Sequence, residues 1–417
     1  MRYTELKYGS SKINVELPQS IKWHVLQKDV PFSSEPEQAL IDRGIDELLQ
    51  QLRTRISTKS SILLIVPDHT RKCNLPAILP ALINRLEREL LANVTILVAN
   101  GSHMQQPEST IIDLVSPEIY QRVRTVQHDS LRQDQLVSLG ETSFGTDIRL
   151  NKLVTQVDFI ITIGGILYHY FAGFGGGPKM LFPGVAAYES IRKNHARTIT
   201  AEGQFHPDAA NGNIHTNPVY LDLKQVLNFV PNVLSLQVVL SPLGNIVLCK
   251  GGPILETQEK LVPYVQDFYS VHVQEKADIV IAGAGGFPSD VNLIQTHKSI
   301  HHAFQVVKAN GVLVVCAECR DGVGSKTFMP YFEHASSKAI ADALLKDFKI
   351  NGQTALALKE KAEHCRIYFI SSLESKIVEK TGMIACRTIK DVPMKNASTG
   401  TKGYILPQAN ITAPSVA

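Results

Sequence analysis

Short apolar runs alternate with amphipathic stretches along the first half of the chain. Residues 61–66 form a run rich in isoleucine and leucine, and comparable runs occupy residues 94–98 and 157–163. From about residue 77 to 91, leucine and isoleucine recur every three or four positions, which predicts a helix between the first two runs. Continuous apolar runs are typical of strands that are buried on both faces of a parallel sheet. The pattern therefore predicts a doubly wound α/β domain.

The same alternation returns on a smaller scale after residue 275, behind a helix-like segment at 254–268. The elements predicted there are strands at 277–282, 312–316 and 367–370 and helices at about 299–308 and 336–348. A chain of 417 residues is also too long for one ordinary core. We therefore predict two α/β domains with mainly parallel sheets, and an active site in the cleft between them, because such a cleft is a common place for a small ligand.

The expected domains are an N-terminal one over residues 1–270 and a smaller C-terminal one over residues 275–387. The tail, residues 388–417, contains two prolines and is expected to be irregular. Packing of this tail back on the first domain is left open.

The composition narrows the class of protein. With 44% hydrophobic and 19% charged residues, the chain resembles a soluble globular protein. The 42 basic and 39 acidic residues leave a net charge of +3, which is too small to indicate nucleic acid as a partner. No apolar run reaches the length of roughly 18 residues that a membrane span needs, and the first residues lack the hydrophobic core of a signal peptide. We expect a cytoplasmic protein without membrane association.

Six cysteines are scattered through the chain and do not suggest a disulfide framework. Only Cys316 and Cys319 are spaced as C-x-x-C, at the end of an apolar run. A zinc ribbon would need a second such pair, and a redox motif would open a helix. A structural role is therefore the favoured interpretation for both thiols.

The densest group of potentially reactive residues begins at His169 and ends at His195. Between them, three glycines and a proline directly precede Lys179. Glycine gives up packing area where the backbone must approach something closely. The stretch is not a nucleotide-triphosphate loop, because Met180 follows the lysine where Ser or Thr is required. Lys179 is better suited to hold or covalently attach a ligand, so the stretch predicts an active site.

Three of the predicted strands end in polar groups that could bind a ligand. These groups are Asp68-His69-Thr70-Arg71, Asn100-Gly101-Ser102-His103, and Gly164-Gly165 leading to His169. Ligands of open parallel sheets bind outside the carboxyl ends of the strands, so neighbouring strands would bring Arg71, His103 and His169 together. Arginine offers a fork to a carboxylate or phosphate, and two histidines can serve as acid and base. Each residue alone would be interpreted as ordinary surface; the convergence favours a site.

The second region contributes Gln295 and Lys298 behind the segment 283–288. That segment lacks the third glycine of a dinucleotide fingerprint, and its proline interrupts the expected helix start. Gln295 and Lys298 are three positions apart, so they share a helical face. They could reach into a cleft or lie on a solvated face, and the spacing leaves both interpretations open.

Taken together, these motifs resemble the nickel-pincer lactate racemase family. The matching positions are Asp68-x-Thr70-Arg71, Gly101-Ser102-His103, His169 with the glycine-rich turn to Lys179, Asn194-His195, and Gly-Gly-Phe-Pro followed by Gln295-x-x-Lys298. Order and spacing agree over residues 68–298, and the His-x9-Lys-x15-His arrangement is the most specific part.

The resemblance implies a cofactor and a role for each matching residue. The family uses nickel in a nickel-pincer nucleotide, a nicotinic-acid-derived mononucleotide whose two sulfurs and one ring carbon hold the metal. Carried over, Lys179 is the covalent tether and His195 the nickel ligand, and cofactor-synthesis proteins are implied as partners. The implied reaction inverts C2 of a small 2-hydroxy acid by hydride transfer to the cofactor. The other implied roles are acid/base catalysis for His103 and His169, substrate binding for Arg71, Gln295 and Lys298, and cofactor contact for the turn of Asp68, His69, Thr70 and Arg71.

Two positions depart from the family pattern. The turn 72–76 replaces a proline-rich one, and Ile294 stands where the lactate enzyme has an aromatic residue. We therefore expect a substrate other than lactate, such as a larger hydroxy acid or an aldonic (sugar) acid. Two alternatives remain. One makes Lys179 a Schiff-base lysine for pyridoxal phosphate, although no partner motif for the pyridine nitrogen is recognisable. The other is a cofactor- or anion-binding protein of this fold without turnover, against which the intact histidine pair argues.

Overall fold

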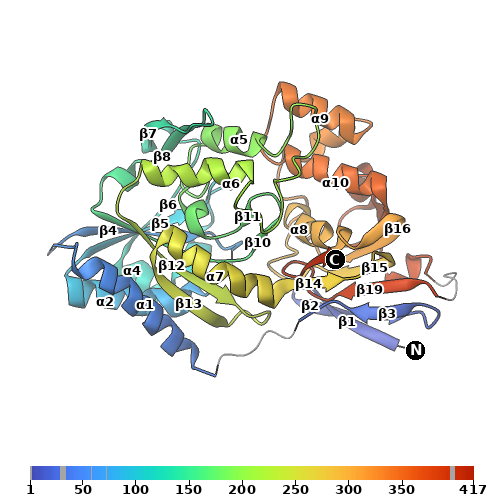
Figure 1. Ribbon diagram of the computed structural model, residues 1–417, viewed down its shortest axis with the longest axis horizontal. Helices are drawn as coiled ribbons and strands as arrows, with labels where there is room; N and C mark the ends of the chain where they lie inside the picture. The colour runs from blue at the N-terminus through green and yellow to red at the C-terminus, as the bar shows by residue number, and fades with distance from the viewer. Residues whose placement is uncertain (1, 29–33, 58, 72, 395–399) are drawn as a thin grey trace. The chain divides into compact units, whose positions relative to one another are not determined.

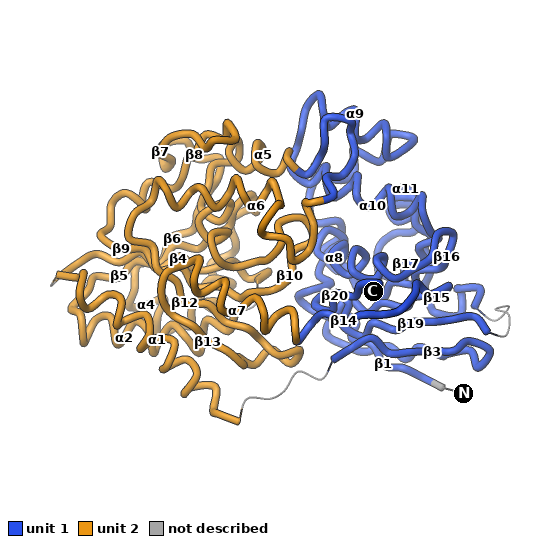
Figure 2. The backbone as a smooth tube through the Cα atoms, in the orientation of Figure 1, with its two compact units in different colours: residues 1–29, 198–207, 268–417 blue, residues 30–197, 208–267 orange. Residues whose placement is uncertain are grey.

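The computed structural model describes residues 2–28, 34–57, 59–71, 73–394 and 400–417 of the chain. The chain forms two compact units, which Figure 2 shows in different colours. Unit 1 comprises Met1–Asp29, Thr198–Pro207 and Phe268–Ala417, and unit 2 comprises Val30–Arg197 and Asp208–Asp267. Lys72, at the start of the altered turn, lies outside the described residues.

Unit 2 is built on a six-stranded sheet in which every neighbouring pair is parallel except β12 and β13. In spatial order its strands are β13 (Ile246–Pro253), β12 (Val233–Leu240), β9 (Phe159–Gly165), β4 (Ser61–Pro67), β5 (Asn93–Ala99) and β6 (Arg124–Gln127). The three strands predicted to carry site residues are β4, β5 and β9, and they are adjacent in the order β9-β4-β5. The predicted parallel α/β fold is confirmed for this half of the chain.

One face of this sheet is covered by helices (Figure 1). These helices are α1 (Glu37–Arg53), α2 (Leu75–Leu90), α3 (Glu108–Val115) and α4 (Pro117–Arg122). The helix predicted at about 77–91 is α2. Alternate residues of β4, namely Ile62, Leu64 and Val66, share a buried core with leucines of α1 and α2, because successive side chains of a strand point to opposite faces. Burial of each such side chain contributes about 1.5–3 kcal/mol, so this core holds the strands that carry the site.

The segments that follow β9 return to the carboxyl end of the sheet. They are β10 (Tyr168–His169), β11 (Gly173–Phe174), the short helix η3 (Gly177–Met180) and α5 (Tyr188–Ala196), followed after residue 207 by α6 (Pro218–Leu223). Of these, η3 packs against β4 and β9. A separate hairpin of β7 (Leu136–Glu141) and β8 (Asp147–Asn151) precedes β9 in the chain.

Unit 1 contains a second six-stranded sheet, and all of its strands are parallel. Their order is β18 (Ile384–Cys386), β17 (Arg366–Ile370), β16 (Val307–Cys316), β15 (Ala277–Gly283), β19 (Lys402–Leu406) and β3 (Lys22–Val25). The helices of this unit are α8 (Leu293–Phe304), α9 (Ser337–Lys346), α10 (Gly352–His364) and α11 (Ser375–Lys380). Helix α8 packs on β15 and β16, and α10 packs on β17. The chain is therefore an α/β protein with two mainly parallel sheets, as predicted.

The first 29 residues belong to unit 1, not to a domain that spans residues 1–270. Strand β3 pairs in parallel with β19, and the hairpin of β1 (Arg2–Tyr8) and β2 (Ser11–Leu17) places Leu6 and Val15 in the core of the unit 1 sheet. The pairing joins a four-residue strand to one near the opposite end of the chain. Such a long-range contact has no local signal in the sequence.

The tail departs from the expected irregular conformation. Strand β19 pairs with β15 on one side and β3 on the other, and β20 (Ala413–Val416) pairs with β14 (Ser270–Val273). All of these strands lie in unit 1, so the described part of the tail belongs to that unit, together with residues 22–25 of β3. The run Gly403–Leu406 is short and is followed by proline, so the sequence pattern does not identify it as a strand. Two neighbouring strands nevertheless satisfy its backbone groups.

Helix α8 begins and ends several residues earlier than the predicted helix at 299–308. Its N-cap is Asn292, whose side-chain oxygen accepts the backbone N–H of Gln295 at 2.9 Å. An asparagine in this position is a strong helix-start signal that the apolar spacing alone did not reveal. Gln295 and Lys298 therefore lie on one helix, as their spacing predicted.

The six cysteines are all buried thiols outside any disulfide. Burial raises the pKa of Cys316 and of Cys319 to about 12, so both thiols stay protonated near neutral pH. This agrees with a structural role for the C-x-x-C pair. Within the described ranges, no helix has the length and apolar character to cross a membrane.

Candidate active site

The turn after β4 brings Asp68 to His103, which follows β5. Asp68 is buried, whereas the side chain of His103 is 42% exposed. Oδ2 of Asp68 lies 2.5 Å from Nδ1 of His103, and Oδ1 accepts hydrogen bonds from the backbone N–H and the hydroxyl of Thr70 at 3.0 and 2.6 Å. Asp68 thus orients the imidazole of His103 at the carboxyl end of the sheet.

The charge of Asp68 decides which nitrogen of His103 carries the hydrogen. Burial alone would raise the pKa of this carboxyl, but His103, Arg71 and the hydrogen bond from Thr70 together hold the pKa well below its usual value. An ionised carboxylate only accepts hydrogen bonds. Nδ1 of His103 must therefore donate, and in the neutral ring Nε2 is the atom that can accept a proton.

Arg71 and His69 lie in the same turn, and both are exposed. The backbone N–H of Arg71 donates to the carbonyl of Asp68 at 3.1 Å, which closes the turn. The charge of Arg71 lowers the pKa of both Asp68 and Lys179. Nδ1 of His69 instead lies 2.6 Å from Oε1 of Gln106. Of the two side chains, Arg71 is the one with an electrostatic link to other predicted site residues.

The glycine-rich turn packs closely against its own chain. Gly176 and Gly177 have φ angles of +66° and +53°, a conformation that favours glycine. A Cβ on Gly176 would lie 2.9 Å from the carbonyl oxygen of Gly165, and one on Gly177 would lie 2.6 Å from the side chain of Gln258. The close approach inferred from the glycines is therefore present at these two positions, but it is made to protein atoms. Its effect is to hold η3, and with it Lys179, against the sheet.

Three of the predicted site residues surround the ring of Phe171. The centroid of this ring lies 4.5 Å from that of His169 and 4.9 Å from that of His195. Nζ of Lys179 lies 5.4 Å from the same centroid. Phe171 itself is buried. One aromatic side chain thus brings together the lysine and both histidines of the His-x9-Lys-x15-His arrangement.

The surroundings of this cluster lower the pKa values of two of its members. Burial and the charge of Arg71 lower the pKa of Lys179 to about 7. Burial and the charge of Lys179 lower the pKa of His195 to about 3. Near neutral pH, His195 is therefore a neutral imidazole, the form that binds a metal. A large fraction of Lys179 is the unprotonated amine, which is the nucleophilic form.

Gln295 and Lys298 belong to unit 1 and are described by themselves. Gln295 is buried, Lys298 is partly buried, and Nζ of Lys298 donates to Oε1 of Gln295 at 2.7 Å. Helix α8 therefore presents an amide and an ammonium side by side, a pair suited to a carboxylate or hydroxyl ligand.

A metal at His195 would need additional ligands. Among the residues that the structure describes, no group of three or more His, Cys, Asp or Glu side chains is arranged to hold a metal ion. Soft ligands such as sulfur would have to arrive with a bound group. Phe171 contacts both the neutral imidazole of His195 and Lys179, whose pKa is lowered. This pair fits a metal-carrying cofactor that is attached to the lysine.

Two contributors to the site escaped the sequence analysis. Phe171 stands two positions after His169 in an aromatic run, and that run was the available signal. Asn194 was noted only as part of a motif, yet its amide lies 3.2 Å from Nδ1 of His195. The contact of Phe171 with His195 depends on how the segment after β10 meets α5. Asn194 and His195 are neighbours in α5, and their contact depends on the orientation of the two side chains.

The fold and the site define an α/β protein that presents imidazoles, an arginine and a lysine of lowered pKa around the carboxyl end of a parallel sheet. Residues 8–206 match the lactate racemase N-terminal domain, and residues 272–406 match the lactate racemase C-terminal domain. Because the two matches cover most of the chain, the protein belongs to the lactate racemase family.

Individual relatives agree with this assignment. The chain is 28% identical over 340 residues to the lactate racemase of Thermoanaerobacterium thermosaccharolyticum, covering 80% of this chain and 79% of that one. It is 29% identical over 297 residues to the lactate racemase of Lactiplantibacillus plantarum, covering 70% of this chain and 68% of that one. The structure of the Thermoanaerobacterium lactate racemase apoprotein superposes with a TM-score of 0.87 at 24% identity, covering 99% of this chain and 100% of that one. A protein of Thermotoga maritima shares the fold, with a TM-score of 0.71 at 14% identity, covering 91% of this chain and 98% of that one.

Proposed function

We propose that this chain is a racemase or epimerase that inverts C2 of a small 2-hydroxy carboxylic acid. Membership of the lactate racemase family supports the reaction class. The observation that carries the proposal for this chain is the cluster around Phe171, which gathers a histidine, a lysine of lowered pKa and a second, neutral histidine. A protein that only carried the cofactor would need Lys179 and His195 but would not need His169 beside them.

Lys179 and His195 would hold the nickel-pincer nucleotide of the family. The unprotonated fraction of Lys179 can form the covalent tether, and the neutral imidazole of His195 can ligate nickel. The turn of Asp68, His69, Thr70 and Arg71 would contact the same cofactor. When bound, the cofactor supplies the redox chemistry that removes hydride from C2 and returns it. Maturation would then require cofactor-synthesis proteins as partners.

His103 and His169 would move the hydroxyl proton of the substrate. Nε2 of His103 is the proton-accepting atom, because Asp68 accepts the hydrogen bond from Nδ1. The same carboxylate would stabilise the imidazolium once the proton has moved, as in other carboxylate–histidine pairs. His169, held against Phe171, would act on the opposite face of the substrate. A racemase needs a base for each enantiomer, and two histidines meet that need.

Arg71, Gln295 and Lys298 would bind the carboxylate and hydroxyl of the substrate. The guanidinium offers a planar fork, and the hydrogen-bonded pair on α8 offers an ammonium and an amide. Ile294, the residue before Gln295, is smaller than the aromatic side chain expected there in the lactate enzyme. We propose a substrate that is bulkier or more polar than lactate, such as a larger hydroxy acid or an aldonic acid.

The test uses protein produced in a host that makes the cofactor. Peptide mass mapping is expected to find an adduct of the cofactor on the peptide that contains Lys179, and metal analysis is expected to find nickel. Wild-type protein should then invert at least one 2-hydroxy acid, whereas Lys179→Ala should lack both adduct and turnover. Loaded protein that inverts no 2-hydroxy acid would instead support a cofactor-carrying protein without turnover.

A further inference from the structure

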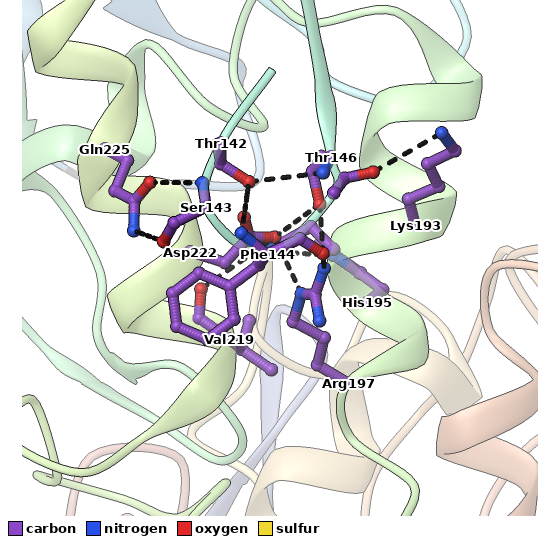
Figure 3. Close-up of polar contacts among 12 residues, drawn as sticks. Thr142, Ser143, Phe144, Thr146, Lys193, His195, Arg197, Val219, Asp222 and Gln225 are labelled. Carbon is purple, nitrogen blue, oxygen red and sulfur yellow. Dashed lines mark hydrogen bonds and ion pairs between the residues drawn. The ribbon is translucent and has the colours of Figure 1, made fainter.

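A buried carboxylate next to the predicted nickel ligand has no assigned role. Asp222, on α6, is completely buried and accepts four hydrogen bonds; Figure 3 shows it among Thr142, Thr146 and Arg197. The donors, at 2.7–2.9 Å, are the hydroxyls of Thr142 and Thr146, Nδ2 of Asn194 and Nε of Arg197. The two threonines come from the tip of the β7–β8 hairpin, and the other two donors come from the end of α5. Asp222 therefore ties the helix that bears His195 to two other elements.

The position of Asp222 determines the orientation of the Asn194 amide. Nδ2 of Asn194 lies 2.9 Å from Oδ2 of Asp222 and 3.0 Å from the carbonyl oxygen of Val219. If the amide were turned by 180°, its oxygen would face two other oxygens at these distances, which is strongly unfavourable inside the protein. The NH2 group therefore points at Asp222 and Val219, and both of its hydrogens are used. Oδ1 is the only part of this amide that faces His195.

This orientation selects one tautomer of His195. Oδ1 of Asn194 lies 3.2 Å from Nδ1 of His195, and an amide oxygen can only accept a hydrogen bond. Nδ1 must then carry the hydrogen, which leaves the lone pair of the neutral ring on Nε2. In metal sites, the partner of the second ring nitrogen commonly selects the ligating nitrogen in this way.

We propose that Asn194 and Asp222 are positioning residues that hold His195 in its Nδ1–H tautomer, so that Nε2 is the atom presented to nickel. The metal-binding half of this inference rests on the proposed function; the tautomer half does not. Arg197 and the two threonines act one step further out, because their hydrogen bonds hold the carboxylate of Asp222 in place. Replacement of such outer partners typically lowers metal affinity by about 10- to 100-fold.

The tautomer is tested first on wild-type apoprotein, with no metal or cofactor present. In protein labelled with 15N in histidine, long-range 1H–15N correlation spectra separate the protonated from the unprotonated ring nitrogen. The signals of His195 are identified by their absence in His195→Gln. We expect a single neutral tautomer with the hydrogen on Nδ1. A hydrogen on Nε2, or an equal mixture of tautomers, would overturn the proposal without any need for a variant to fold.

Variants then test whether the hydrogen-bond network of Asn194 and Asp222 selects the tautomer of His195. Asp222→Asn keeps the shape of the side chain but removes one of the two accepting oxygens, and Asn194→Ala removes the contact to His195. Both are expected to mix the tautomers. Gln225→Ala is the matched control, because Gln225 makes two hydrogen bonds to Ser143 on the same hairpin tip and none to Asn194 or Asp222. It should leave the His195 signals unchanged, and a change as large as that in Asn194→Ala would contradict the proposed path.

Nickel retention in cofactor-loaded protein completes the test. Asp222→Asn and Asn194→Ala are expected to lose nickel to a chelator about 10- to 100-fold faster than wild type and to shift the absorption spectrum of the bound cofactor, with Gln225→Ala at the wild-type rate. If His195→Ala retains nickel normally while the tautomer is as expected, the proposed function fails and the network stands. If His195→Ala loses nickel but the two network variants keep both the tautomer and the metal, the network proposal fails and the function stands.

Discussion

The carboxylate of Asp68 accepts a hydrogen bond from Nδ1 of His103 at 2.5 Å, across 35 positions of the sequence. This contact places the proton-accepting nitrogen of His103 away from the buried carboxylate. A strand-end aspartate and a strand-end histidine on neighbouring strands thus form one hydrogen-bonded pair. The negative charge of Asp68 is therefore expected to contribute to proton transfer by His103, because it would stabilise the imidazolium.

Replacing Asp68 with asparagine should therefore lower activity even though the shape is kept. An amide can turn its NH2 toward Nδ1 of His103, which would favour the wrong tautomer and remove the charge that stabilises the imidazolium. We expect kcat for inversion of the best substrate to fall by about 10²–10⁴-fold, measured on protein with wild-type cofactor content. Glu108→Gln is the control, because it makes the same chemical change at an exposed carboxylate bonded to Tyr120. An Asp68→Asn variant with the rate of this control would rule out the role.

Loss of either proposed acid/base histidine should affect both directions of the reaction. His103→Ala and His169→Ala are each expected to lower kcat by about 10²–10⁴-fold from either enantiomer, since the proton taken by one group must be matched by one given by the other. The measurement is the initial rate from each pure enantiomer. His272→Ala, which removes an exposed imidazole bonded to Ser415, should retain the wild-type rate. One direction preserved at full rate in either variant would contradict the two-base scheme.

The reactivity of Lys179 should rise through neutral pH in the apoprotein. Its pKa is lowered to about 7, so the amine is protonated and unreactive below this pH and becomes neutral above it. Labelling by a small acylating reagent, followed by mass spectrometry of the Lys179 peptide, should show an inflection near pH 7. Ordinary lysines, with a pKa of about 10.4, continue to gain reactivity at higher pH. Arg71→Gln should move the inflection upward, because a nearby positive charge is removed; an inflection near 10 in wild type would refute the assignment.

The residue before Gln295 should influence substrate choice. A panel from lactate through malate and phenyllactate to gluconate is expected to give its highest kcat/KM with an acid larger or more polar than lactate. Ile294→Tyr should then raise the preference for lactate relative to that acid, because an aromatic ring would fill space beside the substrate. Ile294→Leu conserves volume and should change the ratio little. Lactate as the best substrate of the wild-type protein would defeat the size argument.

The glycine-rich turn should respond to substitution position by position. Gly176→Ala is expected to lower the free energy of unfolding by about 1–3 kcal/mol, since it combines a positive φ with a Cβ close to the Gly165 carbonyl. Gly175→Ala should change it by less than about 1 kcal/mol, because that Cβ would meet only ordinary contacts at 3.7 Å. Denaturant unfolding of the two apoproteins provides the comparison. Equal losses would show that packing against Gly165 does not set the requirement for glycine.

The sequence by itself determined the α/β class, the three strands β4, β5 and β9 with the polar residues at their ends, and most of the candidate site, whereas the order of these strands came from the structure. Apolar runs and helical spacing are local patterns, and strand ends in a parallel sheet necessarily point to one edge. For this reason Arg71, His103 and His169 could be grouped before their positions were known. The His-x9-Lys-x15-His spacing likewise identified Lys179 and His195 without reference to the contacts that they make.

Only the tertiary structure decided which segments meet across long distances in the chain. It placed β3 beside β19 and so moved the first 29 residues into unit 1, a pairing between strands too short to carry a local signal. It also showed Phe171 between the lysine and the histidines, and a buried Asp222 that orients Asn194 against His195. The orientation and protonation of a side chain depend on atoms supplied by other elements, and sequence spacing contains no information on those distances.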